Sequence, residues 1–409
     1  MKRVVITGVG AISPLGHDWP TVSARLREER NVVQYIREWD EYEGLNTRLG
    51  TRAAPFEMPA HYNRKVTRSM GRVAIMATMA SEKALADAGL AGDPLVTGGD
   101  MGISYGSSIG SPAAMGDFGN MIARKTTEGI NANTYIRMMS HSAAVNMGVF
   151  LGVTGRIIPT SSACTAGSQG VGYAFEAIQS GRQVAMLAGG AEELDATDAA
   201  VFDTLFATST SNDTPHLSPR PFDADRDGLV LGEGACTLVL EELEHARARG
   251  AKILAEIIGF GTNSDGTHVT QPNPRTMAKA MRLALAGAGL PPEAIGYINA
   301  HGTATEHGDL AETQGTYEVF GGRTPISSLK SYMGHTLGAC GALEAWMSVE
   351  MMRDGWFAPT INLRNVDPRC GDLDYVREGG RSLQTDIVMS NNFAFGGINT
   401  SLIFRRWAD

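Results

Sequence analysis

One cysteine of the chain stands where it could act as a nucleophile. Cys164 lies among small polar residues in TSSACTAGSQG, and the helical pattern that follows stops at Gly181. A thiol at a helix N-terminus faces the positive end of the helix dipole, which favours the thiolate, so such a nucleophile need not rely on a strong base. The small neighbours would let a bulky substrate approach. A lone cysteine is more often a buried apolar residue, so both interpretations stay open for Cys164 alone.

Two histidines and a lysine follow downstream in comparable settings. His301 lies in NAHGTATEHGD, and Lys330 and His335 lie in SLKSYMGHTLGACGALEA. Histidine changes its charge near neutral pH and often takes part in catalysis. Each residue also has an ordinary explanation, because single histidines are often structural and most lysines are solvated at the surface. The order Cys, His, Lys, His, each in a setting rich in Gly, Ser and Thr, is more specific than any one of them.

Such residues need strands that end near one another. Three segments place reactive residues directly after an apolar, strand-like run: IIPTSSACTAGS, YINAHGTATEHGD and ISSLKSYMGHTLGACGALEA. In α/β folds, the loops at strand ends build the active site. Strand-like runs at residues 3–10 and 184–193 alternate with helical patterns such as residues 65–90. This alternation predicts an α/β fold with largely buried sheets.

The chain contains a weak internal duplication. The strand and Gly-rich turn of the N-terminus are echoed from Ala251, in AKILAEIIGFGTNSDG, and a second set of helical and strand-like patterns follows. We therefore expect two halves, residues 1–250 with the cysteine and residues 251–409 with the two histidines. No linker separates them, so they should pack as one body. Residues 386–406 predict a hairpin around a Gly-rich turn.

Composition excludes several classes of protein. The chain has 409 residues and a formal net charge of −9 at pH 7, which argues against broad nucleic-acid binding. The four cysteines lie far apart without a CxxC pair, so we predict no metal site and a reducing, cytoplasmic location. No apolar run reaches the roughly 20 residues of a membrane span. The short apolar run at the N-terminus predicts a first strand rather than a signal peptide.

Taken together, the motifs resemble those of the β-ketoacyl-acyl-carrier-protein synthases of the thiolase superfamily. The match extends over essentially the whole chain, and its motifs include SSACTAGSQGVGYAFEAIQSG, NAHGTATEHGD, SLKSYMGHTLGACGALEA and NNFAFGGINTSLIF. The pattern of one cysteine and two histidines is similar to the elongating enzymes of classes I and II. The resemblance implies a thiolase-like fold, in which two duplicated halves form a five-layer αβαβα sandwich. It also implies an enzyme without a cofactor.

The resemblance further implies a mechanism. Cys164 would attack an acyl thioester and hold the acyl chain, with the oxyanion stabilised by the backbone N–H groups of Cys164 and Phe395. Malonyl-acyl-carrier protein would then lose carbon dioxide and form an enolate. His301 and His335 would donate hydrogen bonds to the thioester oxygen as its negative charge develops. Attack of the carbanion on the acyl-enzyme would give a β-ketoacyl product.

Supporting residues are assigned by the same resemblance. Lys330 looks like the family lysine that orders the site, and Glu312 matches its ion-pair partner. The residues that would bind substrate are Thr303 and Thr305 along the pantetheine arm, Ile109 in the acyl pocket, and Phe393. Ile109 is similar to class II, whereas the GSP that follows it is similar to class I, so the subclass stays open.

Substrates would arrive on an acyl carrier protein, which is strongly acidic in this family. A basic docking surface is therefore expected despite the net charge of −9. Its candidate residues are Lys65, Arg68, Arg124 and Lys125. The alternative is that these are ordinary solvated charges. We expect a homodimer, and a heterodimer with a chain-length partner subunit is the alternative.

One departure from the family pattern concerns the active site. The usual FGFGG is FAFGG here, so Ala394 should restrict backbone motion beside Phe395. The leading hypothesis is decarboxylative condensation in fatty acid elongation, and the same chemistry in a specialised polyketide or aryl polyene pathway is the alternative. A non-catalytic chain-length partner would lack Cys164. A coenzyme A thiolase would carry a second cysteine late in the chain, where this sequence has only a Gly-rich turn.

Overall fold

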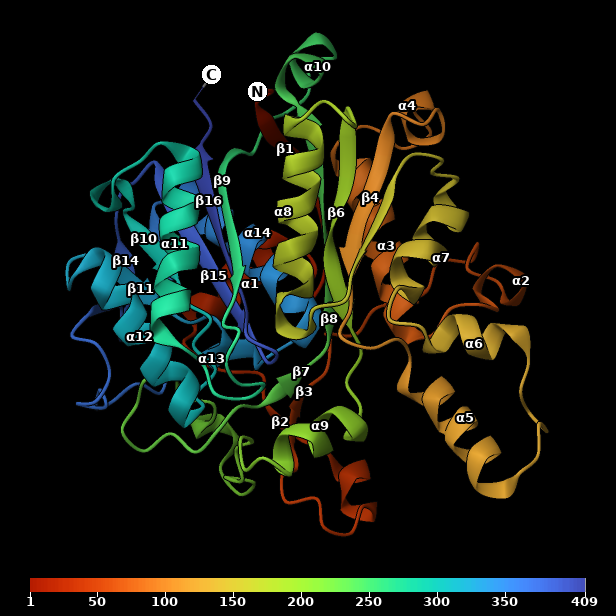
Figure 1. Ribbon diagram of the computed structural model, residues 1–409, viewed down its shortest axis with the longest axis horizontal. Coiled ribbons are helices and arrows are strands. Elements are labelled where there is room, and N and C mark those ends of the chain that lie inside the picture. The colour runs from red at the N-terminus through yellow and green to blue at the C-terminus, as the bar shows by residue number, and fades with distance from the viewer. Residues whose placement is uncertain (409) are drawn as a thin grey trace.

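The chain folds around one large sheet. The computed structural model describes residues 1–408, and in it eleven strands join edge to edge, with helices packed against them (Figure 1). The strands of the first half are β1 (Val4–Ile12), β4 (Met101–Gly106), β5 (Ile157–Thr160), β6 (Ala185–Glu192) and β8 (Gly234–Glu242). The strands of the second half are β9 (Ala255–Ser264), β10 (Tyr297–Asn299), β11 (Pro325–Ser327), β15 (Ile387–Ala394) and β16 (Ile398–Arg406), with β13 (Asp374–Tyr375) at the edge.

The two halves have the same strand order. The first runs β5-β4-β6-β8-β1 and the second runs β11-β10-β15-β16-β9, so each half places its strands in the order third, second, fourth, fifth, first. In both halves the fifth strand is antiparallel to its neighbours. The second strand is parallel to the third and the fourth. β1 and β9 join the halves through a short antiparallel pairing. The duplication predicted from the sequence is therefore confirmed.

The transition between the halves lies after α10 (Leu243–Ala248) and before β9. We propose residue 250, in the connecting turn, as the boundary between the halves at residues 1–250 and 251–409. Residue 409 itself lies outside the described residues.

Helices complete the five layers, in which the strands of the first half form one layer and the strands of the second half form another. α8 (Ala166–Gln179) and α14 (Cys340–Asp354) contact strands of both halves and form the middle layer. α3 (Arg72–Asp87) covers β1 and β8 on one outer face, and α11 (Pro274–Ala288) covers β9 and β16 on the other. On β6, Leu187 packs in the core beneath α3 whereas Met186 packs in the core beneath α8, as alternation along a strand requires. The αβαβα sandwich implied by the resemblance is confirmed.

The remaining elements surround these layers. The other helices are α1 (Trp19–Arg27), α2 (Arg64–Thr67), α4 (Pro94–Thr97), α5 (Pro112–Arg124), α6 (Ala132–Met138), α7 (Ser142–Leu151), α9 (Ala196–Asp203), α12 (Glu306–Phe320) and α13 (Lys330–Met333). Short 3-10 helices are η1 (Arg37–Glu41), η2 (Ala163–Thr165), η3 (Pro215–Leu217), η4 (Pro292–Ala294) and η5 (Leu337–Ala339). One small sheet contains β2 (Gln34–Tyr35), β3 (Leu49–Thr51) and β7 (Leu231–Gly232). A second small sheet contains β12 (Trp356–Phe357) and β14 (Arg381–Ser382).

Local sequence explains most of the element boundaries. The strands expected at residues 3–10 and 184–193 are β1 and β6. The hairpin expected at residues 386–406 is β15 and β16, and its turn needs Gly396 and Gly397 because their φ angles are +87° and +71°. The helix expected at residues 65–90 is divided into α2 and α3. The break falls at Gly71, which caps α3 in an extended conformation.

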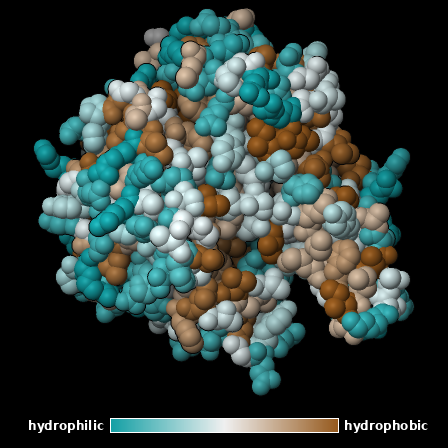
Figure 2. All heavy atoms as spheres, viewed as in Figure 1, coloured by the Kyte–Doolittle hydropathy of each residue, from teal (hydrophilic) through white to brown (hydrophobic). Residues whose placement is uncertain are grey.

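Among residues 1–408, no helix has the length and hydropathy needed to cross a membrane. Exposed apolar side chains gather on the arm that carries α5 and α6, at the lower right of Figures 1 and 2. Ile122 and Tyr135 on this arm are both more than half exposed.

Candidate active site

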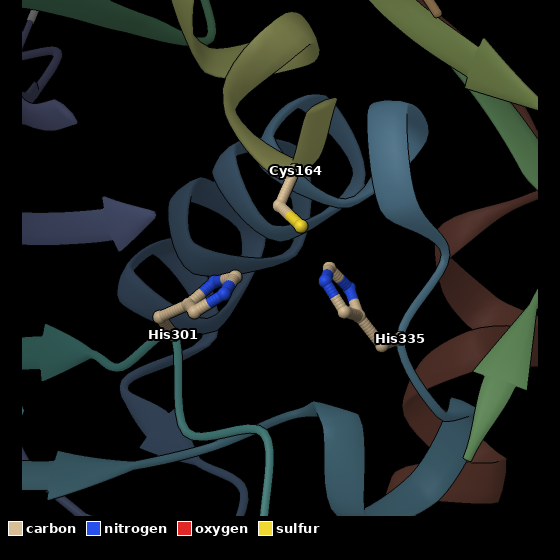
Figure 3. A group of neighbouring side chains, drawn as sticks. All are labelled: Cys164, His301 and His335. Carbon is tan, nitrogen blue, oxygen red and sulfur yellow. The ribbon is translucent and has the colours of Figure 1, made fainter. Parts of the chain in front are cut away.

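Cys164 lies in η2 at the start of α8, shortly after β5, and its side chain points toward two histidines (Figure 3). The side chain is 4% exposed. Ala163, the residue before it, has a φ of +51°, a strained conformation of the kind that clusters at functional sites. The structure therefore places this cysteine at a helix N-terminus, where the sequence analysis expects it.

The protonation state of the thiol differs from the expectation. Burial raises the pKa of Cys164 to about 12, although the charge of Lys330 and the backbone N–H groups of Phe395 and Cys164 lower it. The helix N-terminus does not by itself keep the sulfur ionised, because the cost of burying a charge outweighs it. The thiol must therefore give up its proton when it reacts. Both N–H groups lie beside the sulfur, where an oxyanion formed on an attached acyl group would need donors.

His301 follows β10 and His335 lies between α13 and η5, and both side chains are buried. Their ring centroids are 5.1 Å apart and the rings are nearly perpendicular. Burial lowers the pKa of both histidines well below its usual value, and the charge of Lys330 lowers it further. Both imidazoles are therefore neutral, and each can donate one N–H. Within residues 1–408, neither ring nitrogen of His335 nor Nδ1 of His301 has a hydrogen-bond partner, so these atoms can bind a substrate.

The cysteine and the two histidines also form a possible set of metal ligands. One donor atom from each of Cys164, His301 and His335 lies within 4.8 Å of the others. The positive charge of Lys330, which lowers the pKa of all three, would repel a cation at this point. This donor set therefore fits a metal poorly, and the absence of a metal site stays a prediction.

Lys330 is held by a carboxylate that the sequence analysis did not single out. Its Nζ forms an ion pair with Glu344 Oε1 at 2.5 Å, and the two side chains are 1% and 0% exposed. Asn392 Nδ2 donates to the other carboxylate oxygen at 2.7 Å. The pairing with Glu344 raises the pKa of Lys330 against the opposing effect of burial. The signal was present in the quoted motif GACGALEA, where Glu344 is the one acid among small and apolar residues.

The prediction that Glu312 is the ion-pair partner of Lys330 is wrong. Its two carboxylate oxygens accept instead from the backbone N–H groups of His301 at 2.7 Å and Gly302 at 2.6 Å. Burial raises the pKa of Glu312 to about 8. Glu312 therefore positions the loop of the histidine rather than the lysine.

The loop after His301 is fixed by a second carboxylate. Asp309 accepts from the backbone N–H groups of Thr303 at 3.0 Å and Ala304 at 3.1 Å. The buried guanidinium of Arg226 lies 3.5 Å from the same carboxylate. Thr303 and Thr305 consequently line the cavity beside the catalytic residues, with their hydroxyl groups 2.9 Å apart. Neither Asp309 nor Arg226 was identified from the sequence.

A cavity of about 440 Å³ leads to Cys164. His301, His335, Phe393, Ala394 and Phe395 line it, together with side chains from α9 and from the segment after β9. The ring of Phe395 packs 5.2 Å from that of Phe202 on α9. Phe393 lies 6.1 Å from the ring of His301. The predicted nucleophile, both histidines and the residues of the pantetheine path therefore share one cavity, which Lys330 does not line.

Ile109 is the one predicted substrate-binding residue that lies elsewhere. It belongs to the loop after β4, is half-buried, and does not line the cavity of the described chain. Its role in the acyl pocket stays a prediction.

The predicted docking residues are all exposed, but they lie in two places. Lys65 and Arg68 lie on or next to α2, and Arg124 and Lys125 lie at the end of α5 on the protruding arm. Arg64, Arg68 and Arg137 line a hollow of about 350 Å³, together with three polar residues, and this hollow is distinct from the cavity at Cys164. Arg64 and Arg137 were not identified from the sequence, because α2 and α6 meet only in the folded chain.

Two family models match the chain. The model of the β-ketoacyl synthase N-terminal domain matches residues 1–246, and that of the C-terminal domain matches residues 254–364. The chain belongs to the β-ketoacyl synthase family. It is therefore an enzyme of the acyltransferase type.

Curated relatives cover the full length of this synthase. It is similar to 3-oxoacyl-[acyl-carrier-protein] synthase 2 of Synechocystis sp., with 38% identity over 99% of the chain and 98% of the relative. It is 37% identical to 3-oxoacyl-[acyl-carrier-protein] synthase 1 of Escherichia coli strain K12 over 100% of both chains. Since relatives called synthase 1 and synthase 2 are nearly equally similar, the comparison leaves the subclass open.

Two solved structures are also similar over the whole length. A β-ketoacyl synthase from Burkholderia phymatum STM815 is 59% identical and superimposes with a TM-score of 0.99 over 100% of both chains. The ishigamide ketosynthase/chain length factor is 33% identical, with a TM-score of 0.89 over 100% of both chains.

Proposed function

We propose that the protein condenses an acyl group held on Cys164 with malonyl-acyl-carrier protein, releasing carbon dioxide and a β-ketoacyl-acyl-carrier protein, as in fatty acid elongation. The observation that carries this proposal is the meeting of one buried thiol with two neutral histidines, of which His335 has both ring nitrogens unpartnered and His301 has its Nδ1 unpartnered. The acyl groups would be carried on the phosphopantetheine arm of the carrier, and no further cofactor is needed. Free cysteines at all four positions fit the proposed cytoplasmic location.

In the first half-reaction, the sulfur of Cys164 attacks the carbonyl carbon of an acyl thioester. The new S–C bond forms as the bond to the pantetheine sulfur breaks, and the proton of the thiol leaves with the pantetheine thiol. An unpartnered nitrogen of His301 or His335 can relay this proton, because both imidazoles are neutral. The N–H groups of Cys164 and Phe395 receive the oxyanion.

In the second half-reaction, the malonyl thioester loses its carboxylate as carbon dioxide, and the C–C electron pair passes into an enolate. N–H groups of His301 and His335 stabilise the charge on the thioester oxygen. The ion pair with Glu344 holds the positively charged ammonium group of Lys330 near both rings. This charge lowers the pKa of both histidines and keeps them neutral. The enolate carbon attacks the acyl-enzyme, and the released sulfur takes up a proton from solvent.

Mass spectrometry tests the proposal directly. After exposure to octanoyl-acyl-carrier protein, the intact protein should carry one octanoyl group on Cys164. Addition of malonyl-acyl-carrier protein should remove this group from the protein and give β-ketodecanoyl-acyl-carrier protein. Cys164→Ala should stay folded and carry no adduct. An adduct on Cys340, or condensation with acetyl donors alone, would overturn the assignment.

A specialised polyketide or aryl polyene pathway is the second candidate. It is favoured by the similarity over the whole chain to the ishigamide ketosynthase/chain length factor. The chemistry at Cys164 would be the same, and only the acyl group and the partner subunit would differ. A panel of acyl-carrier-protein thioesters, scored by loading of Cys164, separates the two pathways.

The proposed partner is an acyl carrier protein that docks beside the cavity. The exposed cations Lys65, Arg68, Arg124 and Lys125 supply positive charge on a chain with a net charge of −9. Complementary charge would guide an acidic carrier and orient its arm. Arg64 and Arg137 extend the patch at Arg68.

The proposed assembly is a homodimer, with a chain-length partner subunit as the alternative. β5 is the terminal strand of the large sheet, and such an edge is a ready site for pairing with another chain. Val149 on the neighbouring α7 is 84% exposed, and the apolar arm of α5 and α6 lies on the same side of the molecule (Figure 1). Light scattering should give twice the chain mass of 43.5 kDa.

A further inference from the structure

Two buried carboxyl groups lie close to the nucleophile without a cation beside them. Glu192 ends β6 and is 0% exposed, and Asp198, in the first turn of α9, is 7% exposed. Burial raises the pKa of Glu192 to about 8 and the pKa of Asp198 to about 7. The charges of neighbouring acids raise both pKa values further. Neither carboxyl is therefore stabilised by an ion pair with a cation.

Each carboxyl has an oxygen without a hydrogen-bond partner among the described residues, although the hydroxyl of Ser108, itself unpartnered, is near enough to Glu192 to lower the pKa of that carboxyl. Glu192 Oε2 accepts from the backbone N–H groups of Ser108 at 2.7 Å and Gly338 at 3.0 Å, but Oε1 has no partner. Asp198 Oδ2 has none either, and the hydroxyl of Ser162, a third and uncharged group, is buried without a partner. Leaving such an atom unsatisfied costs about 1–3 kcal/mol, so this region requires hydrogen-bonding groups from outside the chain.

All three residues belong to segments that lie close to Cys164, the residue to which an acyl group would be attached. Ser162 lies two residues before Cys164. The charge of Glu192 acts on the Cys164 thiol and raises its pKa. α9 packs against Cys164 through Ala199 and Phe202. Phe202 lies one turn after Asp198, on the same face of the helix, and lines the cavity. Glu192 and Asp198 therefore belong to segments that adjoin the nucleophile and the cavity, although neither side chain lines the cavity of about 440 Å³ itself.

We propose that Glu192 and Asp198 select an acyl group that carries a hydroxyl, and that they bind this hydroxyl while the acyl group is attached to Cys164. The proposal rests on the proposed function, because it assumes an acyl-enzyme at Cys164. The two carboxyls are specificity-determining residues and take no part in the reaction itself.

The physical basis is that a buried polar atom costs more free energy when it has no hydrogen-bond partner than one hydrogen bond gains when it has one. An acyl chain of methylene groups alone leaves Glu192 Oε1 and Asp198 Oδ2 unsatisfied and displaces any water that would bind them. An acyl chain with a hydroxyl supplies a donor and also accepts from a protonated carboxyl. Sites built to bind a hydroxyl discriminate strongly against analogues that lack it. One satisfied oxygen corresponds to a preference of about 5- to 150-fold.

The experiment compares octanoyl thioesters of an acyl carrier protein with thioesters that carry a hydroxyl at carbon 4, 6 or 8. The rate of loading of Cys164 is measured by intact mass for the wild type, Asp198→Leu, Asp198→Asn and Val201→Ser. Val201 lies on the exposed side of α9 and serves as the matched control. Melting curves show which variants are folded.

We expect the wild type and Val201→Ser to load one hydroxylated chain at least about 5-fold faster than octanoyl. Asp198→Leu should invert this preference, and Asp198→Asn, which keeps an accepting oxygen, should retain part of it. Equal loading of all chains by the wild type, or the same ratio in Asp198→Leu, would overturn the proposal while leaving the condensing activity intact. Failure of every chain to load Cys164 would instead refute the proposed function.

Discussion

Replacing Glu344 by glutamine tests the buried ion pair that holds Lys330 in the active site. The two side chains are 1% and 0% exposed and their charged atoms are 2.5 Å apart. Glutamine keeps the volume of the side chain and can still accept a hydrogen bond from Asn392, so the change removes charge and creates almost no cavity. The ammonium group is then left buried without a counter-charge. Such a loss costs about 3–5 kcal/mol in the free energy of unfolding.

Urea unfolding followed by tryptophan fluorescence measures this cost. Glu318→Gln is the matched control, because Glu318 forms an ion pair of 2.7 Å with Arg282 in which both side chains are about half exposed. Exposed pairs contribute roughly 0–1 kcal/mol, so the control should unfold almost like the wild type. A double variant, Lys330→Met with Glu344→Leu, should recover most of the stability, since it removes both charges. It should remain inactive.

Two results would refute the argument. If Glu344→Gln loses no more stability than Glu318→Gln, the pair does not act as a buried ion pair. If the double variant is as unstable as Glu344→Gln, the loss arises from packing and not from the isolated charge of Lys330.

Three further outcomes follow from the geometry of the site. Cys164→Gln should retain or exceed wild-type decarboxylation of malonyl-acyl-carrier protein while losing condensation, and loss of both in a product assay would show that the roles of His301 and His335 are misassigned. Folding lowers the pKa of His335, so below about pH 6.5 the unfolded chain binds more protons than the folded chain. The free energy of unfolding therefore decreases as the pH falls through this range. His335→Gln should thus gain in melting temperature relative to the wild type between about pH 7 and 5, and a constant difference would contradict this sign. Arg68→Glu should raise the KM for an acyl-carrier-protein substrate about 5-fold but leave loading from a free pantetheine thioester unchanged, and an equal effect on both would exclude a docking role.

The catalytic motifs could be predicted because their signals are local. The small residues around Cys164 and the start of α8 lie within one short segment of the sequence. The hairpin of β15 and β16 was predictable because its turn requires glycine at two adjacent positions. The two halves were predictable because the same order of strands and helices recurs along the chain.

The assignments that failed depended on contacts between distant segments. Glu312 lies 18 residues before Lys330 and Glu344 lies 14 residues after it, and both are acids on helices near the site. Only the packing of α14 in the middle layer brings Glu344 to the lysine, while α12 directs Glu312 to the backbone of His301. Sequence spacing does not distinguish these two placements.

The sequence by itself determined which residues are available for chemistry: a cysteine before a helix, two histidines and a lysine, each next to small residues. The tertiary structure decided the state in which they act. A helix dipole is a local property and favours a thiolate, but burial by the whole fold raises the pKa of Cys164 to about 12. The same burial keeps His301 and His335 neutral and leaves oxygens of Glu192 and Asp198 without partners. Desolvation depends on every layer around a group, and so it appears only when the five layers are assembled.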